Sequence, residues 1–244
     1  MFVVLASRDD AAARSLVARW QQHGAGLLTC ADLSVPGWRL ELGTDGVGRS
    51  TAVVDGRVLA SEQIHGVLTL LPCVFPHELP QIVPGDRDYV AQEMTAFLLA
   101  WLTGLDCPVL NRPNATSLAG PSWPAERWRH LARRAGLRAA PLRRQTTAVP
   151  GDAVLPAPPA AATVTVVGDR WIGDVPPDLA AHARRLAGAA GADLLTVVFD
   201  RADADASVLL ADPRPPVADE RVADAILALL HQAATTRRHA GAGR

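Results

Sequence analysis

The stretch Phe2-Val-Val-Leu-Ala6-Ser7-Arg-Asp-Asp10 decides the fold at the start of the chain. Its first five residues form a short apolar run, typical of a buried strand. Ser7 and Asp10 have the spacing of a capping box, with Asp10 where glutamate is usual, so we expect Ser7 to cap a helix that runs to about Gln22. Leu27–Leu28 then begin a second apolar strand. This strand–helix–strand order predicts a parallel sheet.

The same alternation continues along the chain. We expect strands at Gly66–Leu71 and Cys107–Leu110, with a long helix at Asp86–Leu105 between them. Asp55-Gly56 and Gly168-Asp169 each separate two strand-like runs, which is the pattern of a tight hairpin. Further strands are expected at Trp38–Leu42, Leu194–Phe199 and Ser207–Ala211, and further helices from Ser122 to about Ala135, at Asp178–Ala189 and at Asp219–Ala233. The fold class is therefore expected to be α/β.

The composition excludes several kinds of chemistry. The chain has 244 residues, and all 24 of its basic residues are arginine. Without lysine there is no Walker-A phosphate loop, whose lysine reaches the β- and γ-phosphates of a nucleotide. A lysine Schiff base and a lysine general base are excluded for the same reason.

Charge and cysteine content indicate the compartment. A net charge of −1 gives no signal for nucleic acid or for an acidic membrane surface. Three cysteines (Cys30, Cys73 and Cys107) form no paired framework, which favours a reducing compartment. The N-terminus lacks the basic segment and long apolar run of a signal peptide, and no run approaches the ~18 apolar residues that span a bilayer. We therefore expect a cytoplasmic protein.

Six short motifs follow one another over most of the chain. They are Gly66-Val-Leu-Thr69, Asp88-Tyr-Val-Ala-Gln-Glu93, Val109-Leu-Asn-Arg-Pro113, the segment Trp128–Leu142, Thr163-Val-Thr-Val-Val-Gly-Asp169 and Leu209-Leu-Ala-Asp-Pro-Arg-Pro-Pro216. Their order resembles the ATP-grasp superfamily, in the branch that modifies carboxylates of peptides and proteins. The resemblance implies a parallel-sheet pre-ATP-grasp-like domain followed by a reduced ATP-grasp-like half.

This resemblance also implies domain boundaries. We expect the first domain at residues 1–115 and the reduced grasp-like domain at residues 116–234. The second domain contains a proline-rich linker at 150–159, and residues 235–244 are expected to be a disordered tail.

Departures from the family pattern concern its nucleotide site. In the family, a long stretch before the Val-Val-Gly-Asp hairpin holds the phosphate-binding lysines, the adenine hinge and a glycine-rich flap, whereas here Arg143–Ala162 is short and rich in proline and alanine. In the metal-binding strand, the glutamate position is Leu210 and the asparagine position is Asp212. Leucine cannot ligate Mg²⁺, which takes oxygen ligands, although Asp200 and Asp212 could still hold a cation weakly. We therefore expect no cofactor, with ATP and Mg²⁺ binding lost.

The loop after Leu71 has the most reactive composition. Cys73, His77 and Glu78 lie within six residues and could form a nucleophile–base pair or part of a metal site. The alternative is a cysteine that is simply packed among apolar neighbours, because no other ligand clusters with it.

Arginines gather in a later stretch, where guanidinium groups could bind oxyanions. They are Arg127, Arg129, Arg133, Arg134, Arg138, Arg143 and Arg144. Asn111 and Arg112 follow a predicted strand, at the sheet edge where α/β proteins often bind ligands. Asn111, Arg112, Arg127 and Arg134 are our candidate ligand-binding residues, with a solvated helix face and a structural turn as the alternatives. Asp200, Asp203 and Asp205 lack the glycine and glutamate of a calcium loop and are interpreted as a hairpin turn.

Three functions stay open on the sequence. The first is a non-catalytic ATP-grasp-like accessory protein that binds a peptide or a partner enzyme in a peptide-modification pathway. The second is a repurposed enzyme that uses Cys73, His77 and Glu78. The third is a minimal ATP-dependent carboxylate–amine ligase completed by a partner chain. We expect a peptide or protein partner, such as a modifying enzyme, with a homodimer as an alternative, and neither nucleic acid nor membrane.

Overall fold

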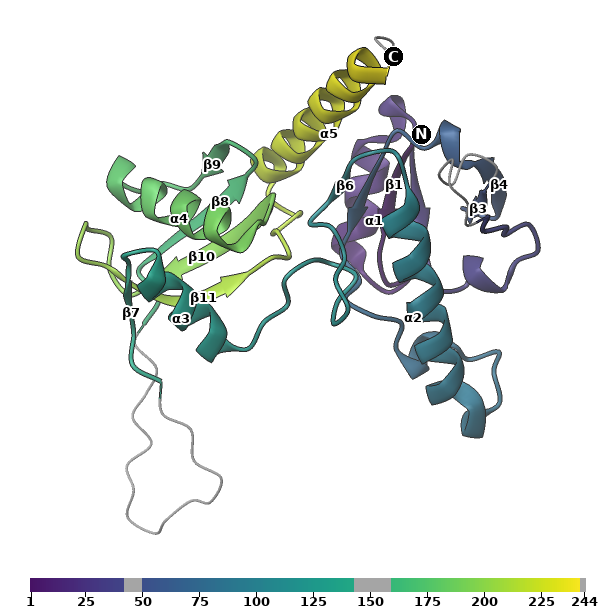
Figure 1. Ribbon diagram of the computed structural model, residues 1–244, viewed down its shortest axis with the longest axis horizontal. Helices are drawn as coiled ribbons and strands as arrows, with labels where there is room; N and C mark the ends of the chain where they lie inside the picture. The colour runs from purple at the N-terminus through teal and green to yellow at the C-terminus, as the bar shows by residue number, and fades with distance from the viewer. Residues whose placement is uncertain (42–49, 143–158, 242–244) are drawn as a thin grey trace. The chain divides into compact units, whose positions relative to one another are not determined.

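The parallel sheet predicted from the first residues is present. The computed structural model describes residues 1–41, 50–142 and 159–241 (Figure 1). Its contacts divide the chain into an N-terminal unit, Met1–Ser122 with Pro216–Arg244, and a second unit, Trp123–Pro215. The N-terminal unit contains a four-stranded sheet of order β2-β1-β5-β6, in which all neighbours are parallel. Its strands are β1 (Phe2–Leu5), β2 (Ala25–Leu28), β5 (Gly66–Thr69) and β6 (Val109–Leu110).

Helices cover both faces of this sheet. They are α1 (Ala11–Arg19), α2 (Arg87–Gly104) and the C-terminal α5 (Glu220–Gly241). Val3 and Leu5 of β1 share a buried apolar cluster with Trp101 of α2. Phe2 points to the opposite face, where its ring meets that of His231 on α5 at 4.7 Å. Successive strand residues face opposite sides of a sheet, so α2 and α5 cover opposite faces.

A hairpin lies between β2 and β5 in the sequence. It consists of β3 (Thr51–Val54) and β4 (Arg57–Ala60), paired antiparallel. Asp55 and Gly56 have φ angles of 50° and 68° in the turn, as the sequence predicted for a type I′ turn. Short 3₁₀ turns occupy Gln21–His23, Asp32–Ser34, Ser61–Gln63, Pro76–Glu78 and Pro84–Asp86.

The second unit is a mixed five-stranded sheet with two helices. The strand order is β7-β11-β10-β8-β9, in which only β7 and β11 are parallel. Its elements are α3 (Ala125–Arg134), β7 (Arg138–Ala139), β8 (Ala162–Val167), β9 (Arg170–Ile172), α4 (Pro177–Ala190), β10 (Leu194–Phe199) and β11 (Ser207–Asp212). Trp128 of α3 and Leu179 of α4 pack with Val197 and Phe199 of β10, so both helices bury the same face of the sheet.

Some element boundaries differ from the sequence prediction. Helix α1 begins at Ala11, because the side chain of Asp10 accepts a hydrogen bond from the backbone N–H of Ala13 at 2.9 Å. The predicted cap, Ser7, accepts one from Asp9 instead. Helix α3 likewise begins after Pro124 rather than at a Ser122 cap.

Two larger predictions also need correction. The predicted strand Trp38–Leu42 is reduced to one isolated bridge between Arg39 and Thr51, and residues 42–49 lie outside the described residues. The tail predicted to be disordered from residue 235 is helical as far as Gly241, because α5 continues through it.

The two units also divide the chain differently from the expected domains. The contact boundary follows Ser122 rather than residue 115, and the segment after Pro216 belongs with the N-terminal unit. Arg19 of α1 explains this, since its guanidinium pairs with Asp224 and Glu220 of α5 at 3.0 and 3.1 Å. Most of the proline-rich stretch 150–159 lies outside the described residues. In the described part of the chain, no helix combines the length and the apolar character needed to cross a membrane.

The two candidate caps of α1 can be compared directly. Replacing Asp10 with alanine removes the acceptor of the Ala13 N–H, and we expect it to lower the free energy of unfolding by about 1 kcal/mol. The matched change Ser7→Ala leaves the helix cap in place, and we expect less than about 0.5 kcal/mol. Urea denaturation followed by circular dichroism measures both. A loss of stability in Ser7→Ala as large as that in Asp10→Ala would contradict the assignment of the helix cap to Asp10 alone.

Candidate functional site

The loops after β5 and β6 meet at the carboxyl edge of the parallel sheet. Leu68 of β5 is paired with Leu110 of β6, so Asn111 directly follows β6 beside the end of β5. The backbone N–H of Leu118 donates to the carbonyl of Pro72 at 2.8 Å and joins the two loops. The structure therefore brings the Cys73 loop and the Asn111 loop to one edge, where parallel α/β sheets commonly bind ligands.

Asn111 and Arg112 have different surroundings at this edge. Asn111 is buried with a φ of 52°, and a Cβ on Gly120 would lie only 2.7 Å from the Asn111 Cβ. Close packing and a left-handed backbone therefore explain Asn111 as a structural residue. Arg112 is exposed, so of the two it is the one available to a ligand.

The Cys73 loop does not form a nucleophile–base pair. Cys73 is half-buried, and burial raises the pKa of its thiol. The ring of His77 stacks on Phe75 at 5.5 Å, and its side chain is 72% exposed. No hydrogen bond joins Cys73 to His77 within the described residues, whereas a working pair needs donor and acceptor in contact. Among the described residues, the Cys73 thiol therefore has no hydrogen-bonded base.

Glu78 is the unusual residue of this loop. Its carboxylate is buried, and neither oxygen accepts a hydrogen bond in the part of the chain that the structure describes. The nearest basic group is the His77 imidazole, whose Nε2 lies 4.0 Å from Oε1.

Cys30 belongs to the same region, although it is not among the site residues predicted from the sequence. Burial, and secondarily the negative charge of Glu78, raise the pKa of the Cys30 thiol to about 12. Cys30 follows β2 as Cys73 follows β5, so its position after a parallel strand is the signal that could have found it. Thiols with raised pKa values are poor nucleophiles at neutral pH.

Strand β10 determines which residues share the face of the second sheet opposite α3 and α4, called the open face below, on which Leu210 is exposed and Thr165 is buried. Thr196 of β10 is paired with Thr165 on one side and Asp212 on the other. One row of this face therefore reads Thr165, Thr196, Asp212, and the two hydroxyls lie 3.1 Å apart. The next row reads Thr163, Val198, Leu210, with Leu210 51% exposed.

The two candidate metal ligands lie at opposite ends of the β10–β11 hairpin. Asp200 follows β10 and accepts from the N–H of Ser207, the first residue of β11. Asp212 is the last residue of β11, and its carboxylate pairs with Arg214 at 3.3 Å. Five residues of extended strand separate these ends by about 17 Å. The two aspartates therefore cannot ligate one ion, and the weak cation site suggested by the sequence is corrected.

The residues of the open face do not fit Mg²⁺ with ATP. Asp212 has hydroxyl neighbours in its row and Leu210 has apolar and hydroxyl neighbours in its own. Magnesium needs several oxygen ligands in octahedral geometry, usually including carboxylates. Among the described residues, no group of three histidine, cysteine, aspartate or glutamate side chains could hold a metal. The interpretation of Asp203 and Asp205 as part of a hairpin turn agrees with the antiparallel pairing of β10 and β11.

Helix α3 carries four arginines against one glutamate. The guanidinium of Arg127 lies over the ring of Trp123 at 4.0 Å, which holds the side chain at the start of the helix. Arg134 is exposed in the last turn, where a positive charge interacts favourably with the helix dipole. Arg143 and Arg144 lie outside the described residues.

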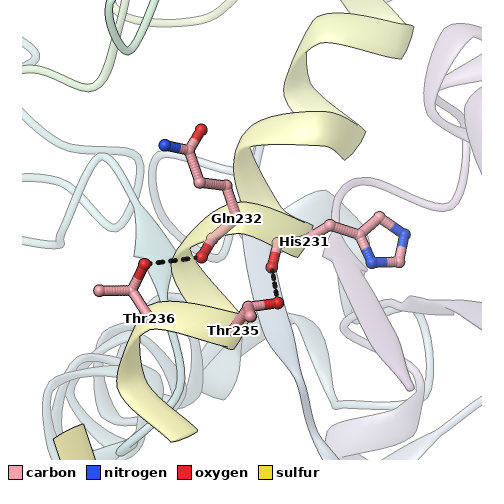
Figure 2. A pocket seen from close by; sticks show the side chains of 4 residues that line it. All are labelled: His231, Gln232, Thr235 and Thr236. Atoms are coloured by element: carbon pink, nitrogen blue, oxygen red, sulfur yellow. Dashed lines mark hydrogen bonds between the residues drawn. The ribbon is translucent and has the colours of Figure 1, made fainter. Parts of the chain in front are cut away.

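Two surface hollows elsewhere in the structure are poorly suited to a charged ligand. One lies along α5 and is lined by His231, Gln232, Thr235 and Thr236. Figure 2 shows that both threonine hydroxyls donate to carbonyls of their own helix, at 2.9 and 3.0 Å. The other, of about 470 Å³, includes Arg184, Arg185, Asp169 and Asp193, whose charges balance.

Comparison with known proteins identifies the fold. No protein-family model matches the sequence, and no curated protein matches it. Among solved structures, the ATP-grasp ligase PsnB complexed with minimal precursor, Mg and ADP has a TM-score of 0.63 and 16% identity, over 94% of this chain and 98% of that chain.

Two further structures are similar to the same extent. The macrocyclase MdnC of Microcystis aeruginosa MRC, bound with precursor peptide MdnA, has a TM-score of 0.62 and 13% identity, over 93% of this chain and 99% of its own. A RiPP-associated ATP-grasp ligase of Chryseobacterium gregarium, in complex with ADP and a leader and core peptide, has a TM-score of 0.63 and 12% identity. The similarity covers 95% of this chain and 96% of that chain. At these identities the likeness establishes the fold: the chain has the ATP-grasp fold, as the order of its sequence motifs predicted.

Proposed function

We propose that this chain is a non-catalytic protein of ATP-grasp fold that binds a peptide, or an enzyme acting on that peptide, in a peptide-modification pathway. The peptide part of the proposal is supported by three similar structures, each of which contains a precursor or a leader and core peptide. The non-catalytic part rests on the residues of the chain itself.

The observation that carries the proposal is the composition of the open face of β10 and β11. Phosphoryl transfer depends on cations held around the phosphates. Here the strand that resembles the metal-binding strand of the family presents Leu210, and its one carboxylate, Asp212, is already paired with Arg214. The chain also has no lysine to contact a phosphate. A face of threonine, valine and leucine, whose aspartate is paired with an arginine, suits a peptide better than a nucleoside triphosphate.

Nucleotide binding tests this proposal. Calorimetric titration of the protein with Mg-ATP and with Mg-ADP is expected to show no binding at micromolar concentrations, because the open face offers neither a lysine nor a pair of carboxylates. The variant Leu210→Glu, at an exposed position, is expected to change the free energy of unfolding by less than about 0.5 kcal/mol and to leave nucleotide binding absent.

The outcomes separate the remaining alternatives. Micromolar affinity of the chain alone would contradict the proposal. Micromolar affinity that appears only when a partner enzyme is added would favour the minimal ligase completed by a second chain.

Cysteine alkylation tests the alternative of a repurposed enzyme. A thiol whose pKa is raised has less thiolate at every pH below that pKa, so its reaction is slower and shifts to higher pH. We expect iodoacetamide at pH 7.5 to modify Cys73 more slowly in the folded protein than in the unfolded chain, with a rate that continues to rise at a higher pH than it does in the unfolded chain. Cys30, with its pKa raised to about 12 and its side chain buried, is expected to react only after unfolding. Peptide mass spectrometry gives both rates.

Unfolding in guanidinium supplies the control, since all three thiols are then free to react. Faster modification of Cys73 in the folded protein than in the unfolded one at neutral pH would indicate an activated nucleophile and favour the enzyme.

A further inference from the structure

A small basic cavity lies beside α3 in the second unit. Its volume is about 230 Å³, and it is lined by Glu126, Arg129, His130, Arg133, Ala140 and Leu142. Its lining residues come from α3 and from the segment that follows β7. Three basic side chains and one acidic side chain contribute to its wall.

Arg129 is the residue of this wall that most needs a partner. Its Nε and Nη1 atoms are buried, and neither donates a hydrogen bond in the described part of the chain. A buried donor without an acceptor is unfavourable, because it has lost its water without gaining a partner. The cost is larger for a charged group.

Arg133 adds a second charge to the same helix face. It lies four residues after Arg129, a spacing at which like charges repel on a helix. Neither arginine forms an ion pair with a carboxylate within the described residues, in contrast to Arg19 and Arg138, which both do. An anion in the cavity would relieve the repulsion and supply the missing countercharge.

The lining favours one kind of anion. Ala140 and Leu142 make part of the wall apolar, and Leu142 is 41% exposed. Glu126 repels a phosphate dianion more strongly than a carboxylate with a single charge. A carboxylate on a methylene stem would place its oxygens near the arginines and its stem near Leu142.

We propose that the α3 cavity binds an aspartate or glutamate side chain of the polypeptide partner. This inference rests on the peptide-binding function proposed above and adds the chemical class that is recognised and the residues that recognise it. Arg129 and Arg133 provide the charge, and Leu142 contacts the stem.

Fluorescence anisotropy of a short labelled peptide tests the inference on the full chain. The probe alternates glutamate and glycine, and its matched control replaces each glutamate with glutamine. We expect only the glutamate peptide to bind, and Arg129→Gln and Arg133→Gln each to weaken its affinity about tenfold, the effect of one lost charge-assisted contact. The control Arg184→Gln removes the same charge from α4, in the charge-balanced hollow, and is expected to change affinity less than twofold.

Three results would overturn the inference. A loss of affinity in Arg184→Gln equal to that in Arg133→Gln would indicate general charge attraction. Displacement of the peptide by inorganic phosphate at matched anion concentration would assign the cavity to a free oxyanion. Equal binding of both peptides, unchanged in the Arg133→Gln variant, would refute the carboxylate site while leaving peptide binding intact.

Failure of this inference is distinguishable from failure of the proposed function, because equal binding of both peptides would remove only the carboxylate site, whereas nucleotide titration tests the non-catalytic part independently. Arg133 is exposed, so its substitution keeps the test decisive if Arg129→Gln unfolds the second unit. Thermal melts followed by circular dichroism check the fold of each variant.

Discussion

The pairing of β10 with β8 on one side and with β11 on the other is the constraint on which the candidate chemistry depends. Because directly paired residues share a face, this register places Thr196 between Thr165 and Asp212, and Val198 between Thr163 and Leu210. The same register directs Val197 and Phe199 into the core against α3 and α4. The register of β10 thus determines which residues form the core of the second unit. It also determines which residues lie on the open face, where few oxygen ligands are available to a magnesium nucleotide.

Much of the fold follows from local sequence signals. The apolar run at Phe2–Ala6 predicts a buried strand of a parallel sheet, and Asp55-Gly56 predicts a hairpin turn, because each property is local to a few residues. Helix starts are harder to predict, because Ser7 and Asp10 are both good capping residues. In the structure it is Asp10 whose side chain accepts the hydrogen bond from the N–H of Ala13. The docking of α5 on β1 could not be predicted, because it joins residues more than two hundred positions apart, Phe2 and His231.

The site could be predicted only in part. The position of Leu210 in the strand that resembles the metal-binding strand of the family follows from motif order. The separation of Asp200 from Asp212 does not, since it depends on hairpin register and on the irregularity between Val198 and Phe199. The burial of Arg129 and of Glu78 also has no local signal, because it depends on packing against residues distant in sequence. Composition shows that the arginines are numerous, and the structure identifies Arg129 as one whose buried Nε and Nη1 have no hydrogen-bond partner among the described residues.

The packing of α5 on the first strand has a consequence for the order of folding during synthesis. Phe2 is synthesised more than two hundred residues before His231 and Leu230, which cover the face of the sheet on which it lies. Domains usually fold as they emerge, N-terminal part first. Here the second unit, Trp123–Pro215, is complete before α5 is made, so the part of the first sheet that α5 covers stays exposed until the residues after Pro216 have emerged.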